Sequence, residues 1–506
     1  MPSGNFQING RFIYNELYAV VPPELNRLWE RIMEDLWSKQ PFFNRHEFIG
    51  NLSRCDEVAD KLHIVVQYSL IKEGEIVGKV LGTTKTCEKL RRFTNFSGPY
   101  PYLKLTSDEI SSDRVLLGTT IDRPGYNKEM SYIVANLSFE DITITRHFGP
   151  SDSHERHLTF FLAGPRRLWS IHETPEFSFT GDIKNKVHNS KIELNEDFPF
   201  EIEVIPCYFR DKTSAPDNHY ELTANVLTMH FKTKESLEQL SNDDLVNSGK
   251  ALADDITLLM SFLSRRWITW YRYELATNDS VKAFTRRTRD CATQEPNWSD
   301  TLIEPDKSRK FLKIGLSNLR KLRAENFDLF MPLLYFVSGH EAKYLEEQFT
   351  TSFLSLEKTK DMFAIKKNFQ KNLKDRSFKK LRSLISETIR RNTEFSEVVE
   401  KIQGKIPELN RPSLRFILES LFKEYNITWK DIYPSTSKFT LIKTRDDLFH
   451  SSQKFNIGLL VKELYRLQAL IERLLLRMLG WQDLSRSPTE HKKKWLTTVE
   501  NDSNHT

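Results

Sequence analysis

The sequence predicts an α+β protein with several domains, in which a β-rich N-terminal domain precedes a C-terminal, all-α helical bundle. The chain has 506 residues, more than one hydrophobic core usually organises. Apolar and polar residues alternate through much of the first half, as in strands, whereas apolar residues recur every three to four positions after about residue 325, as in helices. Hydrophobic residues make up 39% of the chain, which is enough for packed cores and argues against disorder.

Cysteine usage, hydropathy and charge favour a cytoplasmic protein. The four cysteines form no CxxC pair, so we expect neither a disulfide framework nor a cysteine-based zinc site. Residues 1–12 lack the basic and apolar regions of a secretory signal. No run approaches the roughly 18 apolar residues that span a bilayer, so we expect no membrane partner. The formal net charge of +5 is small for this length and does not by itself indicate nucleic-acid binding.

The first predicted element is an amphipathic helix that follows Pro22 and Pro23. Proline suits the first turn of a helix, because the N–H that it lacks would have no helical partner there. Apolar residues then follow at helical spacing, namely Leu25, Leu28, Trp29, Ile32 and Leu36. We therefore assign residues 1–48 to an N-terminal helical segment.

A mostly antiparallel β domain is predicted next. In the run KLHIVVQYSLI every second residue from Leu62 to Leu70 is apolar, so these side chains share one face of a strand. Several strands without intervening helices favour antiparallel pairing. Similar runs, separated by turn-forming residues, cover residues 130–139, 141–148, 156–164, 199–209 and 219–231.

A linking helix and a boundary are predicted after the β domain. Residues 235–266 have helical periodicity, and the aromatic run at 267–275 predicts one more strand. Residues 277–310 are polar, with several turn-forming positions, and favour a boundary loop. The predicted parts are a helical segment (1–48), a β-rich domain with the linking helix (49–275), a linker with a basic helix (276–324), the helical bundle (325–482) and a mobile tail (483–506).

Helices are predicted throughout the bundle, and the strongest covers residues 456–480. Its apolar stripe consists of Leu460, Leu464, Leu467, Ile471, Leu474 and Met478. Neighbouring leucines widen this stripe, which favours burial within a bundle, and Gly480 suits the C-terminal stop. Other helical patterns cover residues 327–363, 378–391, 395–406 and 413–425.

Three short patterns are reminiscent of ligand sites but lack a residue that the chemistry needs. The run at 74–80 has P-loop-like glycines one residue too close, and Val80 replaces the Ser or Thr that a metal ion needs. His340 and Glu341 lack the second histidine of a zinc-protease helix. The third pattern is a set of histidines without regular ligand spacing: His147, His154 and His157. We expect neither a metal nor a cofactor.

The stretch TRDDLFH at 444–450 combines a helix start with residues that can act on a phosphodiester. Thr444 can serve as N-cap, and Asp447 three residues later completes an arrangement similar to a capping box. Arg445 then falls at the first helical position, where N–H groups also favour a phosphate. His450 can give or take a proton near neutral pH. Together they could cut RNA without a metal, because the 2′-hydroxyl supplies the nucleophile.

Spacing alone does not distinguish this motif from an ordinary helix start. The same Arg-to-His spacing occurs in RLWSIH (167–172) and RSPTEH (486–491). A five-residue step also turns about 140° around a helix, so Arg445 and His450 would not face each other on one helix. Only TRDDLFH combines a capped helix start, a polar residue after the arginine and a long apolar helix shortly afterwards.

Residues 325–482 resemble the HEPN superfamily, helical bundles found in many prokaryotic toxins and defence ribonucleases. Members carry an arginine, usually followed by a polar residue, and a histidine after four to six intervening positions, before the last long helix. Arg445, Asp446 and His450 match this pattern, and Glu357 in SFLSLEKTKDMF matches the acid of ApeA-like members. The order of a β-rich region, a linking helix and a bundle also resembles that group.

The resemblance implies a metal-independent endoribonuclease with a toxin-like or anti-phage role. HEPN ribonucleases usually act as homodimers in which the motifs of two subunits meet. Arg445 and His450 would then not need to face each other within one helix. His450 would be the general acid or base, Arg445 would stabilise charge on the phosphate, and Asp446 would orient one of them. Products would carry 2′,3′-cyclic phosphate and 5′-hydroxyl ends. A trigger or neutralising partner would act on the N-terminal domain.

Basic residues concentrate in the predicted bundle and favour RNA as its partner. Residues 355–395 hold 12 Lys/Arg against 5 Asp/Glu, a net charge of +7. Such a face suits phosphates, although helices also commonly carry solvated basic faces. A second basic group precedes the bundle and consists of Lys307, Arg309, Lys310, Lys313, Arg320, Lys321 and Arg323.

Two other hypotheses stay open at this point. The bundle could be a non-catalytic HEPN module that binds RNA or a nucleotide, or only dimerises, with the motif as an ordinary helix start. Alternatively, the β-rich domain could do the main work by recognising a ligand or partner. The bundle would then only assemble copies of that domain. The aromatic side chains of Trp267, Trp270, Tyr271 and Tyr273 could stack on a base, but aromatic strands more often pack in a core.

Overall fold

The computed structural model describes most of the chain from residue 43 onward. The helix predicted after Pro22 and Pro23 lies outside the described residues. The last six residues of the segment assigned to 1–48 belong to a strand, which begins at Phe43. The helical pattern at 395–406 falls outside up to 403, and the predicted tail falls outside from 484. The described residues are 43–54, 57–69, 76–83, 103–108, 110–124, 131–147, 156–164, 172–177, 183–188, 191–192, 194, 200–215, 218–233, 240–288, 301–369, 371–391, 404–433, 440–450 and 457–483.

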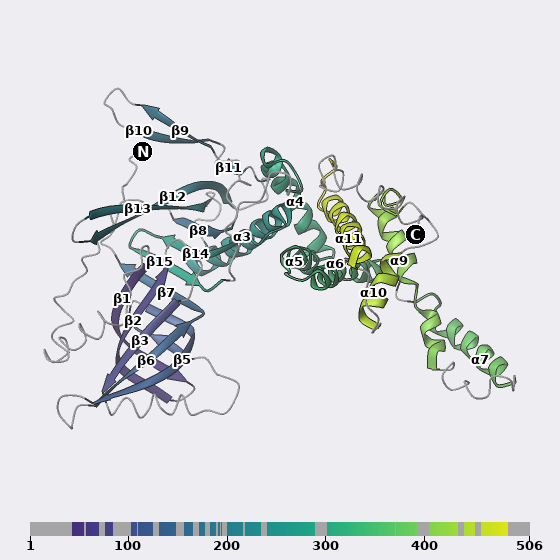
Figure 1. The fold of residues 1–506 in the computed structure, drawn as a ribbon, viewed down its shortest axis with the longest axis horizontal. Helices are drawn as coiled ribbons and strands as arrows, with labels where there is room; N and C mark the ends of the chain where they lie inside the picture. The colour runs from purple at the N-terminus through teal and green to yellow at the C-terminus, as the bar shows by residue number, and fades with distance from the viewer. Residues whose placement is uncertain are drawn as a thin grey trace.

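Six antiparallel strands close into a barrel at the N-terminal end of the described chain (Figure 1). Each strand pairs with the next in the order β1-β2-β3-β6-β5-β4, and β4 pairs back with β1. Leu62, Ile64, Val66 and Tyr68 are fully buried inside it, which confirms the alternation read from the sequence. The strands are β1 (Phe43–Arg54), β2 (Glu57–Ser69), β3 (Ile76–Thr83), β4 (Leu103–Thr106), β5 (Ile110–Pro124) and β6 (Ser131–Phe139).

A second run of strands continues from the barrel through β5, in the order β7-β15-β14-β8-β13-β12-β11. The strand predicted from the aromatic run is confirmed as β14. Strand β15, however, lies where a boundary loop was predicted, so that part of the prediction was wrong. The strands are β7 (Asp141–His147), β8 (His157–Ala163), β11 (Lys191–Ile192), β12 (Phe200–Ala215), β13 (Asn218–Thr233), β14 (Thr269–Ala276) and β15 (Ser280–Arg286), with β9 (His172–Phe177) and β10 (Ile183–His188) as a separate pair.

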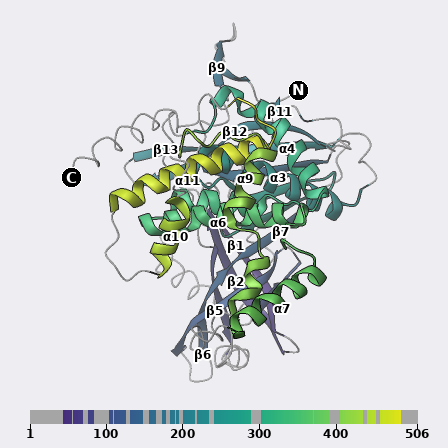
Figure 2. The same cartoon turned by 90° about the vertical axis from the view of Figure 1, so that its right-hand side faces the viewer.

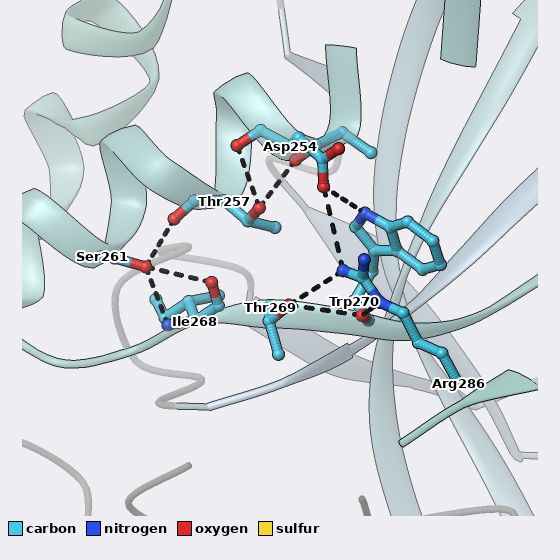
Figure 3. Close-up of polar contacts among 8 residues, drawn as sticks. Asp254, Thr257, Ser261, Ile268, Thr269, Trp270 and Arg286 are labelled. Atoms are coloured by element: carbon cyan, nitrogen blue, oxygen red, sulfur yellow. Dashed lines mark hydrogen bonds and ion pairs between the residues drawn. The ribbon is translucent and has the colours of Figure 1, made fainter. Parts of the chain in front are cut away.

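The linking helix α3 (Asn242–Ser264) joins the sheet through polar contacts as well as apolar ones (Figure 3). Asp254 accepts a hydrogen bond from Trp270 Nε1 at 2.7 Å, and the Arg286 guanidinium lies 3.4 Å from the centre of the Trp270 ring. Ser261 Oγ accepts the backbone N–H of Ile268 at 2.8 Å. Trp270, Tyr271 and Tyr273 are buried in the core and are not exposed for base stacking, whereas Trp267 is half-buried and packs against that core.

The C-terminal half is mostly helical, which confirms an α+β class with its helices gathered after the β-rich region (Figures 1 and 2). One apolar core continues from the β8 side of the sheet through α3 to α11, which is largely buried. No helix among the described residues is long and apolar enough to cross a membrane. The helices are α4 (Ser308–Ala324), α5 (Phe330–Glu341), α6 (Leu345–Lys366), α7 (Asp375–Arg391), α9 (Leu414–Glu424), α10 (Thr440–His450) and α11 (Ile457–Met478).

The predicted end of the last helix is confirmed. Gly480 has φ of +84°, a left-handed conformation that glycine adopts without strain. Trp481 N–H donates to the Leu476 carbonyl at 2.9 Å and so caps the last turn.

Close approach between α5 and α6 depends on a glycine, and its replacement tests the packing of the bundle. A Cβ on Gly339 would lie 2.5 Å from Ser352 Oγ and 3.0 Å from the Ser352 backbone nitrogen. We expect Gly339→Ala to lower the free energy of unfolding by about 1–3 kcal/mol, because the helices must separate. Chemical denaturation measures this change. Gly404→Ala is the control: a Cβ there meets nothing within 4 Å, and we expect no loss of stability.

Candidate functional site

The TRDDLFH stretch lies on α10, but the helix begins one turn earlier than predicted. It starts at Thr440, and Thr444 is inside it with 2% of its surface exposed, so the prediction that Thr444 is the N-cap was wrong. Two contacts extend the helix backward: Leu441 is fully buried, and Thr440 Oγ1 donates to Glu463 Oε1 of α11 at 2.8 Å. The first turn of α10 is therefore buried and bonded to α11.

Helices α10 and α6 lie side by side (Figure 2), and Arg445 of α10 contacts Glu357 of α6. Its Nη1 donates to Asp446 Oδ1 at 2.9 Å, and its Nη2 donates to Glu357 Oε1 at 3.4 Å. The guanidinium carbon also lies 5.7 Å from the centre of the Phe353 ring, one helical turn before Glu357. The fold thus brings together an arginine and an acid that are 88 residues apart in the sequence.

The site is accessible from solvent, and its net charge is negative. The side chains of Arg445, Glu357 and Asp446 are 34%, 26% and 49% exposed. Two carboxylates therefore contact one guanidinium. Arg445 donates one N–H to each of them, so a phosphate that binds its remaining donors must approach two negative charges.

His450 is the last residue of α10, five positions after Arg445 on the same uninterrupted helix. Its side chain lies outside the described part of the structure. A five-residue step rotates about 140° and rises about 7.5 Å along a helix. Position 450 therefore falls on a different side of α10 from Arg445, whose acidic partners are Asp446 on α10 and Glu357 on α6.

Two residues near the site were missed by sequence reasoning. Phe353 lies under the Arg445 guanidinium, and Glu463 holds the start of α10. Glu463 is fully buried, where it also accepts from Tyr433 at 3.2 Å and pairs with Arg466 at 2.9 Å. Burial, together with this carboxylate, raises the pKa of Tyr433 well above its usual value. An acid three residues after Leu460, inside an apolar stripe, is a signal that could have identified Glu463.

The other histidines singled out in the sequence lie in helices or strands where the structure describes them. His340 Nδ1 lies 3.0 Å from the Phe336 carbonyl, at the end of α5. His147 ends β7 and His157 begins β8, whereas His154 lies outside the described residues. Among the described residues, no group of three His, Cys, Asp or Glu side chains could hold a metal ion. The absence of a metal site involving His154 stays a prediction.

Comparisons of the chain with protein-family models, curated proteins and solved structures found no match. Membership of the HEPN superfamily therefore stays a prediction based on the residue pattern. In the structure, Arg445 of α10 contacts Asp446 on the same helix and Glu357 on α6.

Proposed function

We propose that this chain is a metal-independent HEPN endoribonuclease, with a toxin-like or anti-phage role, that acts as a homodimer. The observation that carries the proposal is the ion pair between Arg445 and Glu357. This pair orients the guanidinium of the arginine that begins the motif. Arginine is suited to phosphate because its planar donors bind two oxygens at once. In this scheme the N-terminal β-rich domain senses a trigger or binds a neutralising partner.

Cleavage would proceed by attack of the RNA 2′-hydroxyl on the adjacent phosphorus. The O2′–P bond forms and the P–O5′ bond breaks, which leaves a 2′,3′-cyclic phosphate and a 5′-hydroxyl. One His450 takes the proton from the 2′-hydroxyl, and another protonates the leaving O5′. A dimer provides both histidines. Arg445 stabilises the charge that develops on the phosphate oxygens, and Glu357 holds Arg445 in position.

Removing one acid next to Arg445 should strengthen RNA binding. Asp446→Asn keeps a side chain that can hydrogen-bond Arg445 but removes its negative charge from the phosphate site. An exposed ion pair contributes about 0.2–1 kcal/mol, so we expect RNA to bind up to about fivefold more tightly. Fluorescence anisotropy with labelled RNA measures the dissociation constant. Asp447→Asn, which removes the same charge one residue later, is the matched control and should change binding less.

An RNA that lacks its own nucleophile tests the proposed chemistry. Wild-type protein in EDTA should cut a defined RNA at mapped positions. A copy with one 2′-deoxyribose at the strongest position should resist cleavage there and be cut as before elsewhere. Cleavage on the 3′ side of that deoxyribose would show that the nucleophile is not the 2′-hydroxyl and would contradict the proposal.

The alternative is a non-catalytic HEPN module that binds RNA or a nucleotide, with ligand recognition by the β-rich domain. The observation that favours it is that two carboxylates already neutralise Arg445. This alternative predicts RNA binding without cleavage under any condition. The same RNA assay therefore separates the two functions, provided that binding is measured alongside cutting.

A further inference from the structure

Helix α7 differs from the other described helices of the bundle because none of its residues is buried. It lies beyond α9 at the end of the molecule opposite the barrel (Figure 1). Residues just before it are attached to the bundle: Asn372 N–H donates to the Asn410 carbonyl at 2.7 Å, and Leu373 N–H donates to Asn410 Oδ1 at 2.7 Å. A 17-residue helix whose attachment is this well defined, and which contributes no buried side chain, presents its surface to solvent.

The charges of α7 are nearly all positive and mostly without acidic partners. The helix carries six Lys/Arg against Asp375 and Glu387, a net charge of +4. Only Arg391 is paired within the helix, with Glu387. No carboxylate of the described residues lies within ion-pair distance of the others, which are Arg376, Lys379, Lys380, Arg382 and Arg390.

Five of the six cations of α7 form one face, from which Arg382 is left out. At 100° per residue, the positions of Arg376, Lys379, Lys380, Arg390 and Arg391 fall within an arc of about 120°. From the first to the last, the face is about 22 Å long, at 1.5 Å per residue. Single-stranded nucleic acid can place several successive phosphates along such a length.

In the other basic group, near α4, two of the cations are engaged in contacts within the protein. Lys307 pairs with Glu304 at 3.0 Å and with Asp483 at 3.3 Å. Arg323 donates two hydrogen bonds to Asp255, at 3.1 and 2.9 Å. These cations stabilise contacts within the protein. Two of the seven cations in this group are thus paired within the protein, whereas on α7 only Arg391 has an ion-pair partner among the described residues.

The apolar side of α7 decides between two kinds of anionic partner. A helix that lies in a lipid surface buries a continuous apolar face between the headgroups. In α7 the only strongly exposed apolar side chains are Leu381, at 38%, and Leu384, at 62%, whereas Phe378, Ile385 and Ile389 are partly covered. The basic face is thus better developed than the exposed apolar face, which favours a polyanion in water over a bilayer.

We propose that α7 is an RNA-docking helix, whose basic face binds the phosphates of a single-stranded region away from the Arg445 site. This inference rests on the proposed function in one respect only, namely that the polyanion is the RNA that the bundle cuts. Each phosphate neutralised by a cation on single-stranded nucleic acid releases counterions and adds about 0.7 to the slope of log K against log salt concentration.

The test uses the full-length chain and a single-stranded RNA oligonucleotide with 2′-O-methyl groups, which cannot be cleaved by its own 2′-oxygen. The test variant carries Lys379→Gln, Lys380→Gln and Arg390→Gln, and glutamine preserves helix propensity. We expect the salt slope, measured by anisotropy, to fall by about 2 and affinity at low salt to fall by at least tenfold. The control variant, Lys310→Gln, Lys321→Gln and Lys430→Gln, removes three exposed cations from other segments.

Equal salt slopes and affinities for the test and control variants would overturn the inference. So would binding of wild-type protein to phosphatidylserine vesicles that Leu384→Ser abolishes, if RNA affinity stayed unchanged in the test variant. Failure of the proposed function is distinguishable, because the oligonucleotide measures binding without cleavage. A chain that binds it through α7 but never cuts unmodified RNA would retain the docking helix and lose the ribonuclease assignment.

Discussion

Replacing Arg445 or His450 by alanine should abolish RNA cleavage. We expect a loss of about 10²–10⁴-fold for His450→Ala, since a positioned acid or base contributes that much. For Arg445→Ala we expect a loss of about 10²–10³-fold, the range observed when one donor to a developing oxyanion is removed. Rates of cleavage of a labelled RNA in EDTA measure both. Arg445→Ala should not unfold the protein, because the Arg445 side chain is 34% exposed.

The sequence provides a control with the same spacing for this result. Arg486→Ala and His491→Ala alter another arginine and histidine five positions apart, and both variants should cut RNA as wild type does. Thermal unfolding of all four variants establishes that they are equally folded. If Arg445→Ala and His450→Ala cut as fast as the controls, the catalytic assignment is wrong and the activity belongs to another site or to a contaminant.

The largest expected effect on stability comes from Glu472 of α11. This residue is 2% exposed, and its Oε1 accepts from Arg265 Nη2 at 2.6 Å, which joins the end of the linking helix to the bundle. Arg265 has φ of +55°, a left-handed conformation that is unfavourable for a residue with a side chain. Glu472→Leu leaves Arg265 without this partner in a buried setting, so we expect a loss of about 3–5 kcal/mol in chemical denaturation.

Two controls separate the cost of an unpaired charge from that of a lost contact. The double variant Arg265→Met with Glu472→Leu should recover most of the stability, because a buried ion pair is often replaceable by apolar residues. Glu419→Ala removes an exposed pair with Arg415 on α9 and should cost only about 0.3–0.5 kcal/mol. A single Glu472→Leu variant as stable as Glu419→Ala would show that this ion pair does not hold α11 to α3.

Local patterns predicted much of the secondary structure, but not the way the strands close. The alternation in β2 and the apolar stripe of α11 depend on neighbouring residues, so both were visible in the sequence. Closure of the barrel depends on the pairing of β4 with β1, about 50 residues apart, and no local pattern specifies that pairing. Strand β15 was missed because its alternation, SVKAFTR, is mostly polar and follows a turn-rich stretch.

The candidate site divides in the same way between local and distant features. Arg445, Asp446 and His450 were predicted from one short stretch, and Glu357 only through a family resemblance. The structure adds the ion pair of Glu357 with Arg445. The start of α10 was wrongly predicted at Thr444 because a good capping residue was given more weight than the burial of Leu441. That burial depends on the fold, which the capping pattern does not contain.

The chemical ends of the RNA products test the central claim most directly. Wild-type protein should cut RNA in EDTA and leave 2′,3′-cyclic phosphate and 5′-hydroxyl ends, which ligation and phosphatase sensitivity identify. Such ends arise when the 2′-hydroxyl is the nucleophile, as the Arg445 and His450 mechanism requires. Products with 3′-hydroxyl and 5′-phosphate ends, or cleavage that stops when divalent metal is removed, would contradict a metal-independent HEPN site.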